Sequence, residues 1–468
     1  MQRAAPGTAT DPANPTGTAA SPLETFSGWG RTAPTRAASV RPADAASVVA
    51  LLRDGKSPRI ARGLGRSYGD AAQCGGGVVI DTSDLSGIGP LDETAGTVVV
   101  GGGVSLHDVI RHVLPLGWFV AVTPGTRFVS VGGAIAADVH GKNHHRDGSF
   151  ARHVAALTLA TPSGVFVLRP DGEDRDLFWA TAGGMGLTGV VVEATLRLIP
   201  VETSWMRVDT RRFTRLPELM GAMEDVEDAH RYNVAWLDCL QHRDGSRRSV
   251  LTVADHAPRA ALPGRLRRRE RERPGDPMVR VPLPAPIRLA NRVSVRALNE
   301  AWFWKSTPRQ SFTPLTTYFH PLDGIGGWNL LYGPDGFVQY QFVVPLDRAD
   351  AVEEAVARIA ASGLPSFLAV LKRFGPGTPG PLSFSQQGWT LALDFPVGPT
   401  GLPGLLDDLD ELVAAAGGRV YLAKDARLRP DLLPAMYPRL GEMAALCRRV
   451  DPEGVLASDL SRRLGING

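Results

Sequence analysis

Residues 123–145 place a glycine-rich turn directly before a cluster of groups that transfer protons. The segment reads TPGTRFVSVGGAIAADVHGKNHH, with the pair Gly132 and Gly133 among small side chains. Small side chains let the backbone approach a flat ligand, and backbone N–H groups freed by glycine can bind a pyrophosphate. The polar cluster that follows consists of His140, Lys142, Asn143, His144 and His145. The segment fits a cofactor site beside a proton-transfer centre. Taken alone, it fits a tight turn with solvated histidines equally well.

A second glycine-rich loop lies upstream, at residues 62–70, and reads RGLGRSYGD. Two such loops suit a long ligand that carries phosphates in its middle and a ring at one end. The loop lacks the glycine spacing of a Rossmann dinucleotide site, and no helix start follows it to receive a pyrophosphate. A third run, residues 184–189, matches G-x-G-x-x-G but leads into VVVEATLRLIP, whose alternation predicts a strand. We interpret this third run as a turn that approaches a ligand.

These motifs together resemble the FAD-dependent oxidoreductases of the vanillyl-alcohol-oxidase fold, and among them the oxidases of a polyprenyl-phosphate ribose. The matching segments are RGLGRSYGD, PGT followed by VGGAIA, DVHGKNHH, GSF, LFWATAGGMGLTG and YLAKD. The resemblance runs from about Phe26 to about Leu464 and is interrupted near residues 203–300. It implies an α+β flavoprotein of two domains, in which a PCMH-type FAD domain is joined to a substrate domain built on an antiparallel sheet.

The resemblance also implies that FAD lies extended, with its pyrophosphate on residues 62–70 and its ring near His140. Arg66 stands where relatives that attach FAD covalently often have a histidine. A guanidinium has no free lone pair to attack the flavin and can pair with phosphate instead, so we expect non-covalent FAD. The implied cofactor-binding residues are Arg62, Gly63, Leu64, Gly65, Arg66, Ser67, Tyr68, Gly69, Asp70, Gly125, Ser130, Val131, Gly132, Gly133, Ala137, Asp138, Val139, His140, Val191 and Tyr421.

For catalysis the resemblance indicates Lys424 as the base or hydroxyl-orienting group, with His140 and Tyr68 shaping the site. A base needs a pKa near neutral that only its surroundings can set, so the sequence leaves the ranking of Lys424 and His140 open. The implied substrate contacts are Lys142, Trp236, Phe319, Gln339, Gln341, Lys372 and Ala392. Phe319 replaces a tyrosine of the family, and Ala392 replaces a cysteine of mycobacterial relatives.

Strand alternation gives an independent view of two of these positions. Gln339 and Gln341 lie two residues apart and share one strand face, while apolar neighbours occupy the other. From the pattern alone, that face is a pocket wall or a solvated surface. In the same way, Ala392 shares a face with Thr390 and Asp394.

The reaction that the resemblance implies is transfer of a hydride from the 2′-carbon of a polyprenyl-phosphate ribose to FAD, which leaves a 2′-ketone. A separate NADH-dependent keto-reductase would complete an epimerisation that supplies the arabinose donor of cell-wall arabinan. The alternative within the fold is a soluble sugar-acid, aldonolactone or alditol oxidase that uses oxygen. A flavin-binding or structural protein without turnover is the alternative outside enzymes.

Composition agrees with a globular enzyme. The chain has 468 residues, 43% of them hydrophobic, which is enough for two or three domains with cores of their own. A net charge of +3 does not indicate a nucleic-acid partner. Cys74, Cys239 and Cys447 are too scattered for a disulfide framework or a zinc site, and we expect no metal.

The elements that must position these groups divide the chain into four parts. We expect a disordered tail (1–23), an FAD-binding domain (24–200), a substrate domain (201–414) and a segment that returns to the FAD domain (415–468). Predicted helices are 45–53, 105–113, 349–362, 429–440 and 458–464, and predicted strands include 57–61, 78–83, 97–104, 337–345, 389–395 and 420–425, the last of which delivers Lys424.

A basic loop at about 259–290 contains RLRRRERERPGD. It fits a mobile solvated loop, or a flap that meets anionic lipid or guides a polyprenyl phosphate. No run of about 20 apolar residues is present, and the first residues lack the apolar core of a secretory signal. We therefore expect peripheral contact with the cytoplasmic or periplasmic face of the inner membrane.

Overall fold

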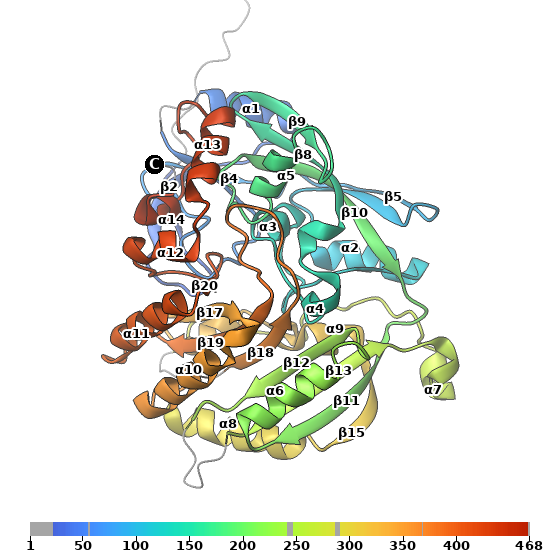
Figure 1. The fold of residues 1–468 in the computed structure, drawn as a ribbon. Helices are drawn as coiled ribbons and strands as arrows, with labels where there is room; N and C mark the ends of the chain where they lie inside the picture. The colour runs from blue at the N-terminus through green and yellow to red at the C-terminus, as the bar shows by residue number, and fades with distance from the viewer. Residues whose placement is uncertain (1–21, 55–56, 241–246, 286–290, 367, 467–468) are drawn as a thin grey trace, which may run out of the picture.

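The computed structural model describes residues 22–54, 57–240, 247–285, 291–366 and 368–466, and three sheets organise them (Figure 1). Most of the predicted tail and residues 286–290 of the basic loop lie outside this range. The smallest of the three sheets has the order β1 (Glu24–Phe26), β2 (Thr35–Val40), β4 (Val78–Asp81) and β3 (Arg59–Arg62). The pairing of β2 and β3 with β4 is parallel.

Helix α1 (Ala45–Arg53) joins this sheet to the next one. Asp44 caps its first turn by accepting a hydrogen bond from the Ser47 N–H, which confirms the predicted start. The buried face of α1 packs with Ile80 of β4 and Val190 of the second sheet, so the two sheets share one small core.

The second sheet has the order β5 (Ile88–Asp92), β6 (Thr97–Gly101), β10 (Val190–Pro200), β8 (Val154–Thr161) and β9 (Gly164–Leu168), and β7 (Trp118–Val120) pairs with the far end of β10. Its helices are α2 (Leu106–Val113), α3 (Val131–Ala136), α4 (His144–Asp147) and α5 (Arg175–Thr181). Ser105 caps α2 as predicted. The predicted strands at 78–83 and 97–104 end earlier, at Asp81 and Gly101.

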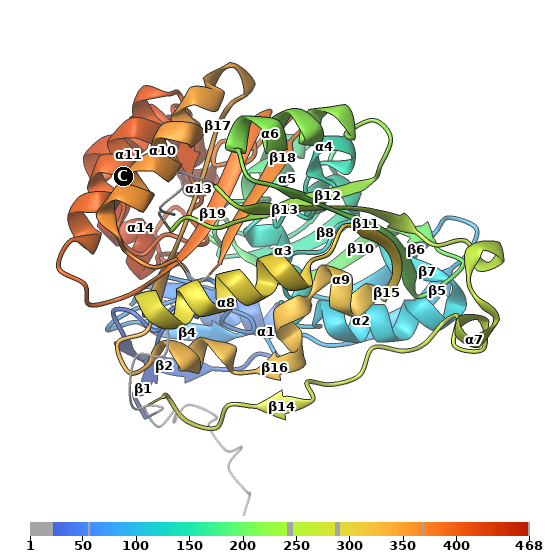
Figure 2. The same cartoon turned by 90° about the horizontal axis from the view of Figure 1, so that it is seen from below.

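The third sheet is antiparallel and has the order β15 (Arg309–Pro314), β11 (Trp205–Phe213), β13 (Ser249–His256), β12 (Tyr232–Leu237), β18 (Ala369–Phe374), β19 (Gly388–Pro396), β17 (Phe337–Pro345) and β20 (Arg419–Val420). Helices α6 (Leu216–Asp225), α10 (Ala349–Ser362) and α11 (Leu402–Ala415) cover one face, while α8 (Arg292–Lys305) and α9 (Leu315–Phe319) lie on the other (Figure 2). Because both faces are covered, every residue of β19 is buried.

The basic loop and the connections form short elements. They are α7 (Gly264–Arg267), the parallel pair β14 (Val279–Arg280) and β16 (Ile325–Gly326), and the 3-10 turns η1 (Leu114–Leu116), η2 (Phe150–His153), η3 (Arg259–Ala261), η4 (Pro321–Gly324), η5 (Trp328–Tyr332), η6 (Leu346–Arg348) and η7 (Pro430–Leu432). None of the described helices combines the length and the apolar character needed to cross a bilayer.

The C-terminal segment contains α12 (Leu433–Met436), α13 (Leu440–Val450) and α14 (Asp459–Leu464) (Figure 1). Leu456 forms a bridge with Arg59 of β3, and α13 contacts α5. Arg463 joins the segment to the glycine loop by pairing with Asp70 at 2.9 Å and Asp425 at 2.8 Å. The domain boundaries themselves stay a prediction.

Two predictions for this segment were wrong. The strand at 420–425 ends at Val420, because the Tyr421 N–H makes the last bond to β17 and the Lys424 N–H then turns back to the Tyr421 carbonyl. The helix at 429–440 is broken, because Pro438 has no N–H to donate and disfavours helical backbone at Tyr437. A new helix, α13, begins at Leu440.

Candidate active site

A cavity of about 840 Å³ lies where the three sheets meet. The glycine loop after β3 and the Gly132–Gly133 pair of α3 form one side, and the third sheet forms the other. The described residues that line it include Lys142, Lys372 and Lys424, but no aspartate or glutamate. Basic side chains without an acid among them suit an anionic ligand, whose charge would favour their protonated forms.

The glycine side of the cavity has the features that FAD requires. No atom lies within 4 Å of the position that a Cβ would take on Gly125, so this backbone opens on free space. Arg66 stacks on Trp29, with its guanidinium carbon 3.8 Å from the ring centroid, and its buried Nε has no hydrogen-bond partner among the described residues. A planar cation with an unused donor is a phosphate ligand. The residues present therefore fit a long, flat, phosphate-bearing cofactor.

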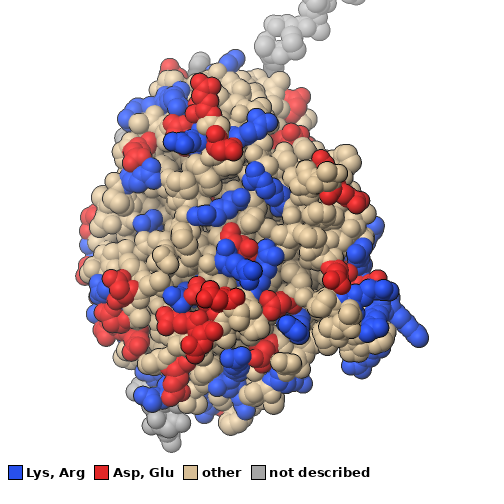
Figure 3. Space-filling model, turned by 45° about the vertical axis from the view of Figure 1, so that its right-hand side comes forward, with Lys and Arg blue, Asp and Glu red and all other residues tan. Residues whose placement is uncertain are grey.

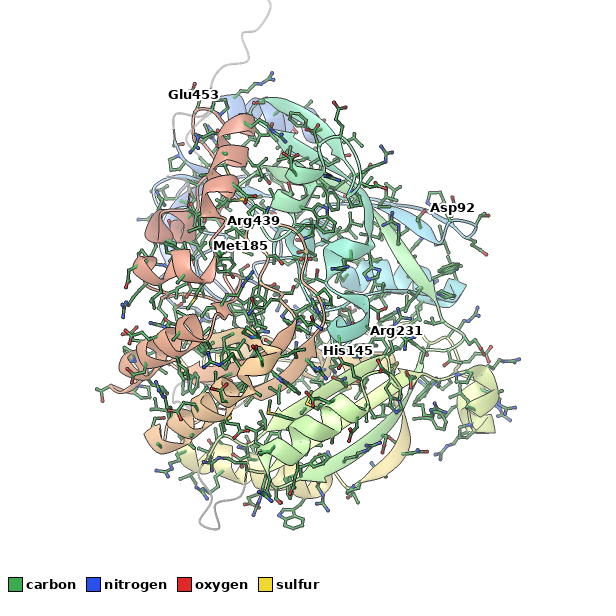
Figure 4. All side chains as sticks on the ribbon, in the orientation of Figure 1. Asp92, His145, Met185, Arg231, Arg439 and Glu453 are labelled. Carbon is green, nitrogen blue, oxygen red and sulfur yellow. The ribbon has the colours of Figure 1, made fainter. Side chains whose placement is uncertain are left out.

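The third glycine run is a turn, as interpreted from the sequence. Met185, labelled in Figure 4, has a φ of 53° and lines the cavity together with Gly186 and Gly189. Non-glycine residues seldom adopt this backbone, and such strain is concentrated at functional sites. The turn leads directly into β10.

The structure brings most of the predicted cofactor residues to the cavity. Those that line it are Gly63, Leu64, Gly65, Arg66, Ser67, Tyr68, Gly125, Ser130, Gly132, Gly133, Ala137, Val139, His140, Val191 and Tyr421. Tyr421 is fixed by donating to the Ala137 carbonyl at 2.6 Å and by stacking on Phe384.

Five predicted cofactor residues do not line the cavity. Arg62 donates to the Ser27 and Ala72 carbonyls, and Asp70 pairs with Arg463. Asp138 is buried and accepts hydrogen bonds from Ser149 and Thr378. Val131 belongs to the core, and Gly69 packs against the Asp425 carbonyl. In the structure these residues support the loops that carry the site, and their contact with FAD stays a prediction.

Lys424 lies on the turn after β20 and lines the cavity. Burial lowers its pKa to about 8, against the attraction of the Asp394 carboxylate. Asp394 accepts hydrogen bonds from Gln339 and from Tyr332, and burial raises its pKa to about 6. No hydrogen bond within the described residues holds the Lys424 ammonium. Its nitrogen lies 5.5 Å from the centroid of the Tyr68 ring. Lys424 is therefore an available amine that titrates near neutral pH.

The hydrogen bonds around His140 indicate which of its two ring nitrogens carries the proton. Thr390 donates to the Phe342 carbonyl at 2.7 Å, so its oxygen accepts from Gln341 Nε2 at 2.9 Å. The same amide nitrogen lies 3.1 Å from His140 Nε2, which must then be the acceptor. The neutral ring carries its proton on Nδ1, 3.1 Å from Lys372 Nζ. Lys372 must accept this proton as a neutral amine.

The acid–base properties of this pair agree with that assignment. Burial, followed by the charges of Lys372 and Lys424, holds the pKa of His140 well below its usual range. Burial, followed by the charges of Lys424 and Lys142, does the same to the pKa of Lys372. Both nitrogens of His140 are engaged, whereas no hydrogen bond within the described residues holds the Lys424 amine.

Lys142 occupies another wall of the cavity. Its ammonium donates to the Tyr318 carbonyl and lies 4.2 Å from the centroid of the Tyr318 ring. Burial lowers its pKa to about 7. Tyr318 lines the same cavity, while its hydroxyl is buried without a hydrogen-bond partner among the described residues.

The remaining members of the polar cluster lie outside the cavity. His144 packs on Phe374, with ring centroids 4.2 Å apart. His145 bonds to the His230 carbonyl, while Arg231 pairs with Asp147, and Figure 4 shows His145 and Arg231 together where α4 meets the third sheet. Three of the five members, Asn143, His144 and His145, therefore support the structure around the cavity and do not line it.

The predicted substrate residues are brought together with one exception. Lys142, Trp236, Phe319, Gln339, Lys372 and Ala392 line the cavity. Gln341 is fully buried behind it and orients His140. The predicted strand faces are confirmed, because Gln341 pairs with Ala392 and Gln339 pairs with Asp394 across β17 and β19.

Sequence reasoning missed Tyr318 and the contribution of α8. Tyr318 is next to Phe319, which the family resemblance had indicated. The sequence alone does not show which side chains of the short helix α9 face the cavity. Leu298, Asn299 and Trp302 of α8 also line the cavity. They lie at the end of the divergent region or just after it, where the family resemblance gave no guide.

Comparison with known proteins decides the family. A family model described as "FAD binding domain" matches residues 37–168. The decaprenylphosphoryl-β-D-ribose oxidase of Mycolicibacterium smegmatis is 43% identical over 444 residues, which cover 93% of this chain and 96% of that protein. The chain belongs to the decaprenylphosphoryl-β-D-ribose oxidase family. It is an FAD-dependent oxidoreductase with a PCMH-type FAD domain.

Two other relatives show how far the similarity extends. An uncharacterised Streptomyces coelicolor protein is 44% identical over 78% of this chain and 100% of its own length. An alditol oxidase of a Streptomyces species is 28% identical over 91% of this chain and 94% of that protein. The alditol oxidase thus shares the fold with the decaprenylphosphoryl-β-D-ribose oxidase family at much lower identity.

Proposed function

We propose that the protein oxidises the 2′-hydroxyl of a polyprenyl-phosphate ribose to the 2′-ketone. The observation that carries the proposal is the cavity lining, in which Lys142, Lys372 and Lys424 meet without a carboxylate. On the glycine side, the phosphates of FAD would pair with Arg66. Lys142 remains available for a substrate that carries a phosphate of its own, which a free alditol does not.

In this reaction bound FAD supplies the hydride acceptor. Lys424 in its neutral form accepts the hydroxyl proton while the hydrogen on the 2′-carbon leaves as a hydride, so that the C–O bond becomes a carbonyl. Asp394 stabilises the ammonium that forms, because its carboxylate attracts Lys424. Gln341 and Lys372 hold the His140 ring in one orientation. Lys142 binds the phosphate or an adjacent sugar oxygen.

The test is reduction of bound flavin by substrate without oxygen. The holoenzyme is mixed with a panel of polyprenyl-phosphate ribose, aldonolactones and alditols, and bleaching of the flavin absorbance is followed. We expect bleaching by the polyprenyl-phosphate ribose alone, with a 2′-keto product. Faster bleaching by an alditol or a lactone would replace the proposal with the oxygen-using alternative, and bleaching by none would indicate a binding protein.

Two further proposals follow from the family. We infer that a separate NADH-dependent keto-reductase consumes the ketone, completing the epimerisation that leads to the arabinose donor of cell-wall arabinan. We also infer peripheral contact with the inner membrane through the basic loop. Its exposed arginines gather at α7 and protrude from the molecule in Figure 3, where Arg265, Arg268 and Arg273 make none of the ion pairs found within the described residues.

A further inference from the structure

The cavity does not end at the reacting centre. It continues from Ala392 across the third sheet, on the face that α8 covers (Figure 2). In register, Ala392 lies opposite Val370, and Trp236 lies opposite both Val370 and Val250. These residues form one row of side chains from β19 to β13, and all of them line the cavity.

A second row extends the floor to the sheet edge. Val234 lies opposite Thr252, Thr252 opposite Thr210, and Thr210 opposite Arg309, so the row crosses four neighbouring strands. Directly opposite side chains on one face are neighbours. Because three of the four are small, the floor is recessed beneath α8 and forms a groove. From β19 to β15 the groove crosses five strand spacings, or about 24 Å at about 4.8 Å each.

Helix α8 forms the roof of the groove. Asn299 is buried and donates to Asp238 at 2.8 Å, and Val295 and Phe303 are buried beside it, so this face fixes the helix on the sheet. Leu298 and Trp302 lie one turn apart and line the groove while remaining 50% and 48% exposed. The apolar passage is therefore open to the surface at these two residues.

We propose that this α8 groove holds the first part of the polyprenyl chain of the substrate, and the inference rests on the proposed function. The groove is continuous with the site where the sugar must react. Its inner end carries the buried amine of Lys142, which suits a phosphate. Its length is lined mainly by valine, threonine and tryptophan, and Lys305 and Arg309 lie at its outer end. A substrate with an anionic phosphate attached to an apolar chain fits a groove whose lining changes in this way. The exposed mouth of the groove lets the remainder of a long chain stay in a membrane.

The experiment compares chain lengths in two variants and a matched control. Thr252→Trp fills the groove, and Trp302→Ala removes its rim. Trp304→Ala removes the same side chain two residues along α8, at a position that is 61% exposed and does not line the cavity. For each holoenzyme, kcat/KM of anaerobic flavin reduction is measured with a short-chain and a long-chain polyprenyl-phosphate ribose, after FAD content and Tm confirm folding.

We expect the long-chain to short-chain ratio of kcat/KM to fall by about 10-fold in Thr252→Trp, the scale of losing about two buried methylene groups. It should fall in the same direction in Trp302→Ala and be unchanged in Trp304→Ala. An unchanged ratio in both groove variants, or equal losses with both substrates, would overturn the groove assignment while leaving the oxidation intact. A wild-type enzyme that neither substrate reduces would instead overturn the proposed function.

Discussion

The proton acceptor can be tested by the pH dependence of flavin reduction. Lys424 must be neutral to take the hydroxyl proton, and burial lowers its pKa to about 8. For such a group the neutral fraction rises from roughly 3% at pH 6.5 to roughly one half at pH 8. The rate of flavin reduction by saturating substrate should therefore rise by about 15-fold across this range and then level off above pH 8.

Two substitutions separate a base from a fixed charge. Lys424→Met keeps the length of the side chain and removes the amine, while Lys424→Arg keeps a positive charge that does not deprotonate. Both should lose about 100-fold or more of the reduction rate, the usual scale for a positioned acid or base. Bound FAD should remain near wild-type content, because Arg66, which we expect to pair with the FAD phosphates, lies on a different loop.

The assay is stopped-flow bleaching of flavin under anaerobic conditions between pH 6 and pH 9, with FAD content measured for each variant. A Lys424→Arg enzyme that keeps the wild-type rate would show that the positive charge, and not proton transfer, is what position 424 contributes. A wild-type rate that is flat from pH 6.5 to pH 8 would refute the assignment of the pKa.

Three other predictions concern the cofactor, Ala392 and the basic loop. Acid precipitation should release yellow FAD into solution, since Arg66 cannot form a flavin bond; flavin held by the pellet would contradict this. The natural protein with Ala392 should be fully active, and Ala392→Cys should add only a thiol that a flavin-activated electrophile labels, as mass spectrometry would show; strong rescue of a weak enzyme by cysteine would give that position a catalytic role. Neutralising Arg265, Arg268 and Arg273 should weaken co-sedimentation with anionic vesicles at low salt, at about 1 kcal/mol per residue at most; unchanged sedimentation would leave the loop without a lipid role.

The sequence predicted the helix starts and strand faces, because these depend only on residues close together in the chain. Asp44 and Ser105 start helices because each accepts a hydrogen bond from its own first turn. The alternation of β17 and β19 placed Gln339 and Ala392 on one face because side chains alternate in any strand. His140, Lys142 and Lys424 reached the cavity as the family resemblance had implied.

Long-range packing decided what the sequence could not show. Asp70 and Asp138 lie within family motifs, yet one pairs with Arg463 and the other with Ser149 and Thr378, partners that come from distant segments. Lys424 arrives on a turn and not a strand, because the ladder with β17 ends at Tyr421. The neutral state of Lys372 on β18 depends on hydrogen bonds that join His140, Gln341 and Thr390. These residues come from separate segments, so no single sequence motif contains the network.

The central claim, that a hydride leaves the 2′-carbon of a polyprenyl-phosphate ribose, is tested most directly by isotopic substitution. Anaerobic flavin reduction is measured with substrate that carries deuterium on the 2′-carbon and, as a control, on the 3′-carbon. We predict slower bleaching with the 2′-label only, and a 2′-ketone as the product. Bleaching slowed by the 3′-label, or a product oxidised at another carbon, would contradict the account.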